Sequence, residues 1–446
     1  MQNLNLTIEN LGPIKKAEIN ISPLTIICGS NNSGKTYISY AIYGLLKSWY
    51  PNLNLGDFSK YAAELIETGT TKIPTEPTQA KQEGLMQALF ENYAASLDTL
   101  FSAPENTFKD AKISTKTKFK SPPPEDSTGS FSIGEMRTIV SENQIEIQLL
   151  NKSKSITQQK LGYFLNIYCG LIMFGEHFPS PFLATAERLG ISLFYKELDT
   201  HRNVLVDTLI QMKDSQNKFD PHEMLEKVVS RYSAPVKDHI QFTRDLETIK
   251  KGKSFLQTEV EKIYTDIEKM LGGEYKLTGQ EMVFKSKSKS TPYIIPSYLG
   301  SSAVRSLSDI YFYLKHKARR DDLLLIDEPE SHLTPANQIQ IARIIARLVN
   351  AGINVFITTH SDYIIKELNN LICLNSEFSN RDSILKKYSY RQTDKLDPNK
   401  ISAYIAKNGK LEQCLINNKG IEVKNLDEAI EQINATADDL MYYMDI

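Results

Sequence analysis

The residues Gly29 to Thr36, GSNNSGKT, combine glycines, a lysine and a hydroxyl at the spacing GxxxxGK[ST]. Such a loop can bind a triphosphate, because glycines let successive backbone N–H groups point at phosphate oxygens. On this pattern Lys35 would reach the β- and γ-phosphates and Thr36 would bind Mg²⁺. A chance glycine-rich turn is the alternative, and the strand and helix patterns on either side argue against it. The residues predicted to contact the nucleotide here are Gly29, Asn31, Asn32, Ser33, Gly34, Lys35 and Thr36.

A second candidate group is the stretch LLLIDEPE, Leu323 to Glu330, in which four apolar residues precede two acids. A buried parallel strand brings the carboxylates at its C-terminal end to the ligand-binding edge of the sheet. We therefore expect Asp327 to hold Mg²⁺ through water, so that Thr36 and Asp327 are the predicted metal ligands. Glu328 would orient and deprotonate the attacking water. The alternative is a strand that ends in solvated acids.

A histidine follows the next apolar strand, in the sequence Thr358-Thr359-His360-Ser361. A single histidine is often a structural hydrogen-bonding residue. Its place at the same sheet edge, one strand beyond the acid pair, favours a contact with the γ-phosphate or with the attacking water. We therefore include His360 among the predicted catalytic residues, with Asp327 and Glu328.

Two serines, Ser301 and Ser302, stand where a helix is expected to begin, in LGSSAVRSLSDIYFYL. The spacing alone is explained by an N-cap, in which a serine side chain accepts a hydrogen bond from a free backbone N–H of the first turn. An N-cap role does not exclude a second role for these hydroxyls.

These residues need an α/β core, and the pattern supplies one in two pieces. Apolar strands are predicted at PLTIIC, LLLID and NVFITT, each followed by a helical pattern, which is typical of a parallel sheet. We expect a split ATPase core at 1–50 and 275–446. The intervening 51–274 would form an antiparallel β subdomain, with strands between 103 and 155, and a helical lobe that includes a long helical stretch from 196 to 271. Hairpins are expected at NLNLTIENLGPIKKAEINI and at EYKL…QEMVF.

Composition narrows the class of protein. The 446 residues carry 52 Lys and Arg against 54 Asp and Glu, so no global charge requires a nucleic-acid partner. The four cysteines are far apart and form no zinc pattern, which favours a reducing compartment. The N-terminus has no signal-peptide pattern and no apolar run reaches membrane-spanning length. We expect a cytoplasmic protein without a membrane partner.

The order of these motifs resembles that of ABC/SMC-like P-loop ATPase heads, most closely the OLD-like branch. The resemblance implies ATP and Mg²⁺ as cofactors, and a head-to-tail homodimer, which can belong to a larger oligomer. In such a dimer Ser301 and Ser302 of one copy would cap the γ-phosphate that the other copy holds. EPESHLTPANQ is similar to the extension after the acid pair, with Thr334 where a histidine is common. AERLG resembles a short motif near the active site, in which Arg188 would face phosphate or pair with a buried carboxylate.

The resemblance also implies a biological role. ATPases of this build occur in bacterial phage-defence systems of the Septu or PARIS type, where they control a separate effector nuclease. An ATPase that acts directly on DNA in repair or chromosome maintenance is the alternative, and it would favour long arms or a strongly basic face. The basic stretches at Lys109 to Lys120, Lys285 to Ser290 and Lys315 to Arg320 could contact DNA, although solvated strand faces and hairpin tips explain them equally well.

Overall fold

The computed structural model describes residues 4–76, 78, 81–120, 122–131, 134–152, 157–195, 232–258, 262–279, 281–288, 292–423 and 428–444. Internal contacts divide the chain into two units. Unit 1 consists of Met1–Ile21 and Tyr40–Pro181, and unit 2 consists of Ser22–Ser39 and Phe182–Ile446. The boundaries of these two units differ from those predicted for the core and the insertion. The predicted core and insertion therefore stay a prediction.

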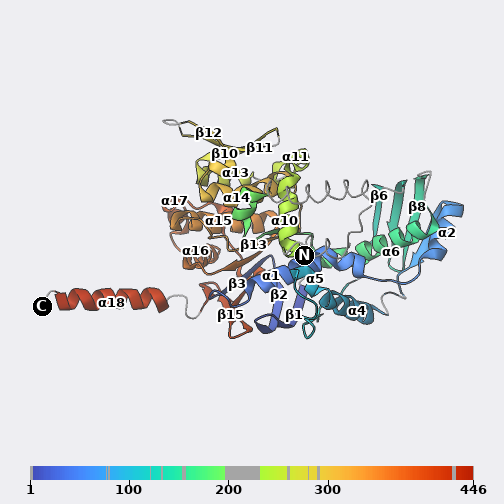
Figure 1. Ribbon diagram of the computed structural model, residues 1–446, viewed down its shortest axis with the longest axis horizontal. Helices are drawn as coiled ribbons and strands as arrows, with labels where there is room; N and C mark the ends of the chain where they lie inside the picture. The colour runs from blue at the N-terminus through green and yellow to red at the C-terminus, as the bar shows by residue number, and fades with distance from the viewer. Residues whose placement is uncertain are drawn as a thin grey trace, which may run out of the picture. The chain divides into compact units, whose positions relative to one another are not determined.

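Unit 2 is built on the α/β sheet that the sequence predicts (Figure 1). Its strands lie in the order β16-β15-β3-β14-β13-β9, and β15, β3, β14 and β13 are parallel neighbours. Every residue of β13 and β14 is buried, as the continuous apolar runs indicate. The bounds are β3 (Leu24–Gly29), β9 (Pro181–Ala184), β13 (Leu323–Asp327), β14 (Asn354–Thr359), β15 (Ile401–Lys407) and β16 (Lys410–Gln413).

Helices follow these strands where the motifs require them. α1 (Lys35–Asn52) follows β3, α15 (Pro335–Ala351) follows β13, and α16 (Asp362–Cys373) follows β14. Thr334 is the N-cap of α15 and accepts a hydrogen bond from the Asn337 N–H, with Pro335 in the first turn, so the predicted helix start is confirmed. The other long helix of the site is α14 (Ser302–His316).

The remaining elements of unit 2 are a hairpin sheet, a small C-terminal sheet, several shorter helices and the 17-residue helix α18. The predicted second hairpin is confirmed as β10 (Gly273–Thr278) and β11 (Glu281–Ser286), and β10 packs beside α13 (Figure 1). The others are α7 (Arg188–Phe194), α10 (Ala234–Arg244), α11 (Leu246–Ile249), α12 (Phe255–Thr258), α13 (Tyr264–Leu271), β12 (Ile294–Pro296), η2 (Ser297–Leu299), α17 (Arg381–Lys387), η3 (Gln392–Asp394), η4 (Pro398–Lys400), β17 (Leu415–Asn417), β18 (Gly420–Glu422) and α18 (Glu428–Met444).

Unit 1 contains the predicted first hairpin, β1 (Leu4–Leu11) and β2 (Ile14–Ile21), paired in antiparallel register. It also contains a four-stranded antiparallel sheet in the order β4-β8-β7-β6. The other elements are β4 (Thr70–Pro74), β5 (Lys112–Thr115), β6 (Glu125–Phe131), β7 (Gly134–Val140), β8 (Gln144–Lys152), α2 (Ser59–Thr68), α4 (Gln82–Ala95), α5 (Leu97–Phe101), α6 (Gln158–Phe174) and η1 (Gly175–His177).

Two expectations about the insertion are corrected. The strand at KISTKTKFK is β5, which pairs with β1 and not with β6–β8, because its buried Ile113 lies opposite Ile8 in the register. The fourth strand of the sheet, next to β8, is β4, which lies before the range 103–155 in which the strands were expected. Of the predicted helical stretch 196–271, residues 196–231 lie outside the described residues. The part that is described forms four short helices, and Pro235 lies in the first turn of α10.

Candidate active site

The predicted phosphate loop joins the end of β3 to the start of α1, as its sequence requires. Gly29 has a φ of +147°, and a Cβ there would lie 2.7 Å from the backbone oxygen of Ala406. Asn32 and Gly34 also have positive φ values, of 61° and 91°. The loop is therefore held in a conformation that two glycines and one asparagine can adopt with little strain. Asn31 and Asn32 are exposed, and the Ser33 hydroxyl oxygen is buried without a hydrogen-bond partner.

Lys35 is buried in this loop, at 6% exposure. Its Nζ donates hydrogen bonds to the backbone oxygens of Gly29 (2.9 Å) and Ser30 (2.8 Å), so the side chain curls back over the loop. Burial lowers the pKa of Lys35, because a buried ammonium loses hydration. The nearby carboxylates, Glu328 foremost, act in the opposite direction and favour the charged form.

The two predicted metal ligands contact each other. Thr36 Oγ1 donates a hydrogen bond of 2.9 Å to Asp327 Oδ2. The other oxygen of Asp327 accepts a hydrogen bond from the Thr358 hydroxyl. Asp327 is fully buried, and this burial raises its pKa above that of an ordinary aspartate. Hydroxyl and carboxylate oxygens are the ligand types that Mg²⁺ prefers.

Glu328 follows in a strained conformation, with a φ of +52°. Left-handed backbone costs a residue with a side chain roughly 1–2 kcal/mol, so the surroundings must hold it. Its N–H donates to the backbone oxygen of Thr358 (3.0 Å) and lies 3.2 Å from the hydroxyl of the same residue. Its side chain is 31% exposed and accepts a hydrogen bond of 3.0 Å from the Ser331 hydroxyl.

Arg188, predicted to face phosphate or to pair with a buried carboxylate, lies beside the acid pair and donates its hydrogen bonds to backbone oxygens. The side chain is 1% exposed, and its guanidinium donates to three backbone oxygens: those of Thr185 (3.1 Å), Asp327 (2.6 Å) and Glu328 (2.5 Å). Together with Thr358, it therefore holds the acid pair from both sides through the backbone. A phosphate contact by Arg188 would have to use a side chain that is already engaged in this way.

His360 lies beside a carboxylate that sequence reasoning passed over, Glu330. Glu330 is 5% exposed, and its Oε1 accepts a hydrogen bond of 2.8 Å from the His360 N–H and lies 3.2 Å from His360 Nδ1. The imidazole is 45% exposed, and its Nδ1 is 3.9 Å from Glu328 Oε1. The signal for Glu330 in the sequence was its place as the third acid of DEPE, because it follows the strand closely enough to reach the same sheet edge.

Ser301 and Ser302 lie at the start of α14. Ser301 is its N-cap and accepts a hydrogen bond of 3.3 Å from the Val304 N–H, which confirms the capping role. Ser302 Oγ is 3.4 Å from an Arg305 nitrogen, and Arg305 also donates to the backbone oxygens of Tyr298 and Gly300. The hydrogen bonds that the structure gives these serines are thus local to their own helix end. Ser301 is exposed and Ser302 is half-buried.

The donor set fits a nucleotide with Mg²⁺. The loop offers backbone N–H groups at the N-terminus of an 18-residue helix, which favours an anion. Thr36 and Asp327 already place two hard oxygens together. The described part of the chain has no cluster of three or more His, Cys, Asp or Glu side chains arranged for a metal. An Mg²⁺ ion at a site of this kind takes its further oxygens from phosphates and water.

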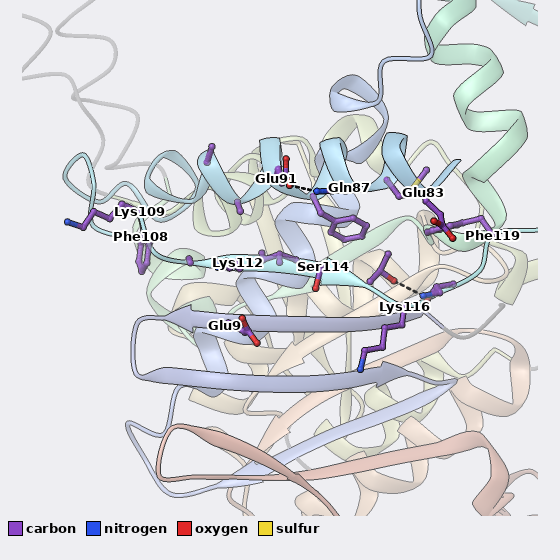
Figure 2. Close-up of a pocket in the computed structure, with 18 of the residues that line it drawn as sticks. Glu9, Glu83, Gln87, Glu91, Phe108, Lys109, Lys112, Ser114, Lys116 and Phe119 are labelled. Atoms are coloured by element: carbon purple, nitrogen blue, oxygen red, sulfur yellow. Dashed lines mark hydrogen bonds between the residues drawn. The ribbon is translucent and has the colours of Figure 1, made fainter. Parts of the chain in front are cut away.

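A separate cavity of about 1300 Å³ lies within unit 1, between α4 and β5 (Figure 2). Four lysines of the first basic stretch line it beside acids that include Glu83 and Glu91, and they are Lys109, Lys112, Lys116 and Lys118. This lining mixes both charge signs, so it does not provide the uniformly basic surface that phosphate backbones favour. None of the predicted nucleotide residues contributes to the cavity.

A strand, a phosphate loop with a buried lysine, and a strand ending in a buried aspartate that contacts the loop threonine define a P-loop α/β protein. The chain matches the family model described as AAA ATPase domain over residues 1–365, and it belongs to that family. It is an ATPase. Among the described residues, no helix is long and apolar enough to cross a membrane.

Solved structures of SMC heads show a distant likeness. The SMC head bound to the C-terminal winged-helix domain of ScpA has 13% identity and a TM-score of 0.37, and the match covers 92% of this chain and 97% of that one. The Pyrococcus furiosus Smc head with an extended coiled coil, bound to the C-terminal domain of ScpA, has 14% identity and a TM-score of 0.33. That match covers 98% of this chain and 99% of the other. The Thermotoga maritima SMC head has 11% identity and a TM-score of 0.33, and the match covers 95% of this chain and 100% of the other. No curated protein sequence matches this chain.

Proposed function

We propose that this ATPase hydrolyses ATP with Mg²⁺ at the edge of the unit 2 sheet. The observation that carries the proposal is the 2.9 Å hydrogen bond between Thr36 and Asp327, which joins the phosphate loop to the acid-tipped strand. Lys35 would turn from the loop carbonyls toward the phosphates of the bound nucleotide, because a triphosphate is a stronger acceptor for an ammonium than two carbonyl groups. Mg²⁺, when bound, would neutralise charge that develops on the transferring phosphoryl group.

The other residues of the site would position the attacking water and the acid pair. Glu328 is partly exposed and close to His360, so it is placed to orient a water molecule and accept its proton. Glu330 would hold His360 through the backbone N–H and the imidazole, so that the ring faces the site. Arg188 acts as a positioning residue, because it holds the backbone of Asp327 and Glu328 and keeps the strained acid in place.

We further propose that two copies complete each site. Ser301 and Ser302 lie at an accessible helix N-terminus, and the Arg305 guanidinium is close to the same helix end. This is an arrangement suited to receiving an anion, and it supports the idea that the γ-phosphate held by one copy is capped by the serines of the other. The expected assembly is a head-to-tail homodimer, which can form part of a larger oligomer.

The test is the ATPase rate as a function of protein concentration, with and without Mg²⁺. A shared site predicts that the rate per chain rises with concentration until the dimer saturates, and that chelation of Mg²⁺ with EDTA removes it. A rate per chain that is independent of concentration down to a range where light scattering shows only monomers would contradict the shared site. Hydrolysis that persists in EDTA would contradict the role of Mg²⁺.

We propose, as the biological role, a sensor or regulatory ATPase subunit of a bacterial anti-phage defence system that controls a separate effector nuclease. The support is the order of the motifs, which resembles that of the ATPases of such systems. Expression of the chain with the product of its neighbouring gene should lower phage plating efficiency, and Lys35→Ala should abolish the protection. If the neighbour encodes a permease, or if Lys35→Ala protects as well as wild type, the defence role is wrong.

A further inference from the structure

A buried histidine–aspartate pair lies in unit 2 outside the predicted site. His239 on α10 and Asp309 on α14 are each 2% exposed, and His239 Nε2 lies 2.9 Å from Asp309 Oδ2. Thr243 donates a further hydrogen bond of 3.3 Å to the same oxygen. Burial of two ionisable side chains is costly unless they are paired, so their presence in the core calls for a reason beyond packing.

The hydrogen bonds of His239 fix which ring nitrogen carries the proton. The backbone N–H of Thr185 lies 3.3 Å from Nδ1, and its hydroxyl lies 3.1 Å from the same nitrogen. A backbone N–H can only donate, so Nδ1 must accept. The proton is therefore on Nε2, which donates to Asp309. The His239 ring therefore accepts a hydrogen bond from Thr185 on one side and donates one to Asp309 of α14 on the other.

The connection continues from Thr185 to the acid pair. The Thr185 backbone oxygen accepts a hydrogen bond of 3.1 Å from Arg188, whose guanidinium also holds the backbone oxygens of Asp327 and Glu328. A path of hydrogen bonds thus runs from Asp309 through His239, Thr185 and Arg188 to the end of β13. α7, which begins at Arg188, also packs against α14.

The other end of the path is fixed by helix geometry. Asp309 lies about two turns after Ser301 and Ser302 on the same helix. A helix of this length moves as one body, so a displacement at its N-terminus reaches Asp309. The path therefore joins the helix end predicted to meet a second copy to the backbone of the acids predicted to perform hydrolysis.

We propose that Asp309 and His239 are positioning residues that couple the place of α14 to the place of Asp327 and Glu328. The coupling rests on the proposed function, because it assumes that a second copy acts on the start of α14. Its physical basis is the cost of leaving a buried N–H or carboxylate unpaired. When α14 shifts, the hydrogen bond between Asp309 and His239 should be kept, so the imidazole ring moves with the helix. Thr185 and Arg188 should then move as well, because Thr185 is hydrogen-bonded to the ring and Arg188 to Thr185.

The test breaks the path at the ring and compares turnover with binding. His239→Asn keeps an acceptor near the position of Nδ1 and loses the donor to Asp309. Asp309→Leu keeps a side chain of similar size and removes the acceptor. Thr243→Val is the matched control, because it removes a buried hydrogen bond to the same carboxylate without interrupting the path. For each folded variant, kcat, the Kd for ATP and the thermal unfolding midpoint are measured.

Coupling predicts that kcat falls at least tenfold in His239→Asn and Asp309→Leu, while the Kd for ATP stays within about twofold of wild type. Thr243→Val should keep kcat within about twofold. The proposal is overturned if either path variant keeps wild-type kcat, or if kcat falls equally in the control with the same loss of thermal stability.

A double-mutant cycle provides a second measurement of the coupling. If His239 acts through Arg188, combining His239→Asn with Arg188→Lys should lower kcat no further than the stronger single variant does. Independent structural effects would multiply, and that result would overturn the proposal. Failure of the proposed function is seen separately, in the unmutated chain, as a rate per chain that does not depend on protein concentration.

Discussion

The Thr36 hydroxyl donates a hydrogen bond of 2.9 Å to a carboxylate 291 residues further along the chain, that of Asp327. The contact forms because β3 and β13 flank β14 in a parallel sheet, so both strands end at the same edge. Asp327 is fully buried there, and no lysine or arginine side chain forms an ion pair with it among the described residues. Keeping this carboxylate buried therefore costs the folded protein free energy, and substitution of Asp327 should reveal that cost.

Asp327→Asn should stabilise the metal-free protein while it abolishes Mg²⁺-dependent hydrolysis. Burial raises the pKa of Asp327 above its value in the unfolded chain. Between these two pKa values the unfolded chain releases the proton and the folded chain retains it, so stability falls as the pH rises through that range. The substitution removes this fall. Because the entropy of unfolding grows with chain length, a gain of about 1 kcal/mol would raise the unfolding midpoint by about 1 °C in a cooperative unit of 446 residues.

The measurement is thermal unfolding in EDTA at pH 5 and pH 8. The variant should exceed wild type by more at pH 8 than at pH 5, and addition of Mg²⁺ with ATP should stabilise wild type only. If Asp327→Asn and wild type had equal unfolding midpoints at both pH values, burial of the Asp327 carboxylate would not carry the assigned cost.

Lys35→Ala should abolish ATP binding, because the loop loses the ammonium that would reach the β- and γ-phosphates. Equilibrium binding of a fluorescent ATP analogue tests this. Lys47→Ala is the matched control, since Lys47 lies exposed on the same helix, α1, and should bind as wild type does. Unchanged affinity in Lys35→Ala would mean that the glycine-rich loop is not the nucleotide site.

Glu328→Gln should bind ATP and fail to hydrolyse it, because the amide keeps the shape of the side chain and cannot accept a proton. We expect turnover to fall by at least 10²-fold, in the range that loss of a general base produces. Radiolabelled ATP should remain bound to the variant over many wild-type turnover times. Turnover within a few-fold of wild type would assign the base to another residue.

Much of this site could be predicted from the sequence, because the motifs coincide with strand ends and helix starts. Lys35, Thr36, Asp327, Glu328 and His360 all lie where strand-to-helix patterns place them. A local sequence pattern predicts that a residue follows the end of a strand. Because the carboxyl ends of parallel strands lie at the same edge of the sheet, residues in such positions lie close together.

The roles that the sequence did not predict depend on contacts between distant segments. Arg188 holds the backbone of Glu328 across 140 residues, and His239 meets Asp309 across 70. Neither pair has a spacing that a motif could reveal. The pairing of β5 with β1 has the same explanation, since a four-residue strand is placed by what its buried side chains pack against.

The sharing of sites between copies makes a prediction about mixtures. Replacing Ser301 and Ser302 with alanine should leave ATP binding by Lys35 largely intact, since their hydrogen bonds are local to α14. Hydrolysis should fail, because the γ-phosphate would meet no serine from the second copy. Lys35→Ala should fail for the opposite reason, since it keeps the serines and loses the nucleotide.

Mixing the two inactive variants should then restore hydrolysis. A mixed dimer joins one intact phosphate loop to one intact pair of serines, which gives one whole site of two. With random exchange at equal amounts, about half of the dimers are mixed, so roughly a quarter of the wild-type rate should return. A capping role alone predicts a loss of about 1 kcal/mol of stability for Ser301→Ala and no recovery on mixing.

The decisive measurement is the ATPase rate against the mixing ratio. A shared site gives a curve with its maximum near equal amounts, whereas each variant alone stays at the baseline. Subunit exchange is confirmed beforehand by energy transfer between differently labelled chains, and folding by thermal unfolding. A flat, inactive line under these conditions would show that Ser301 and Ser302 cap their own helix and complete no neighbouring site.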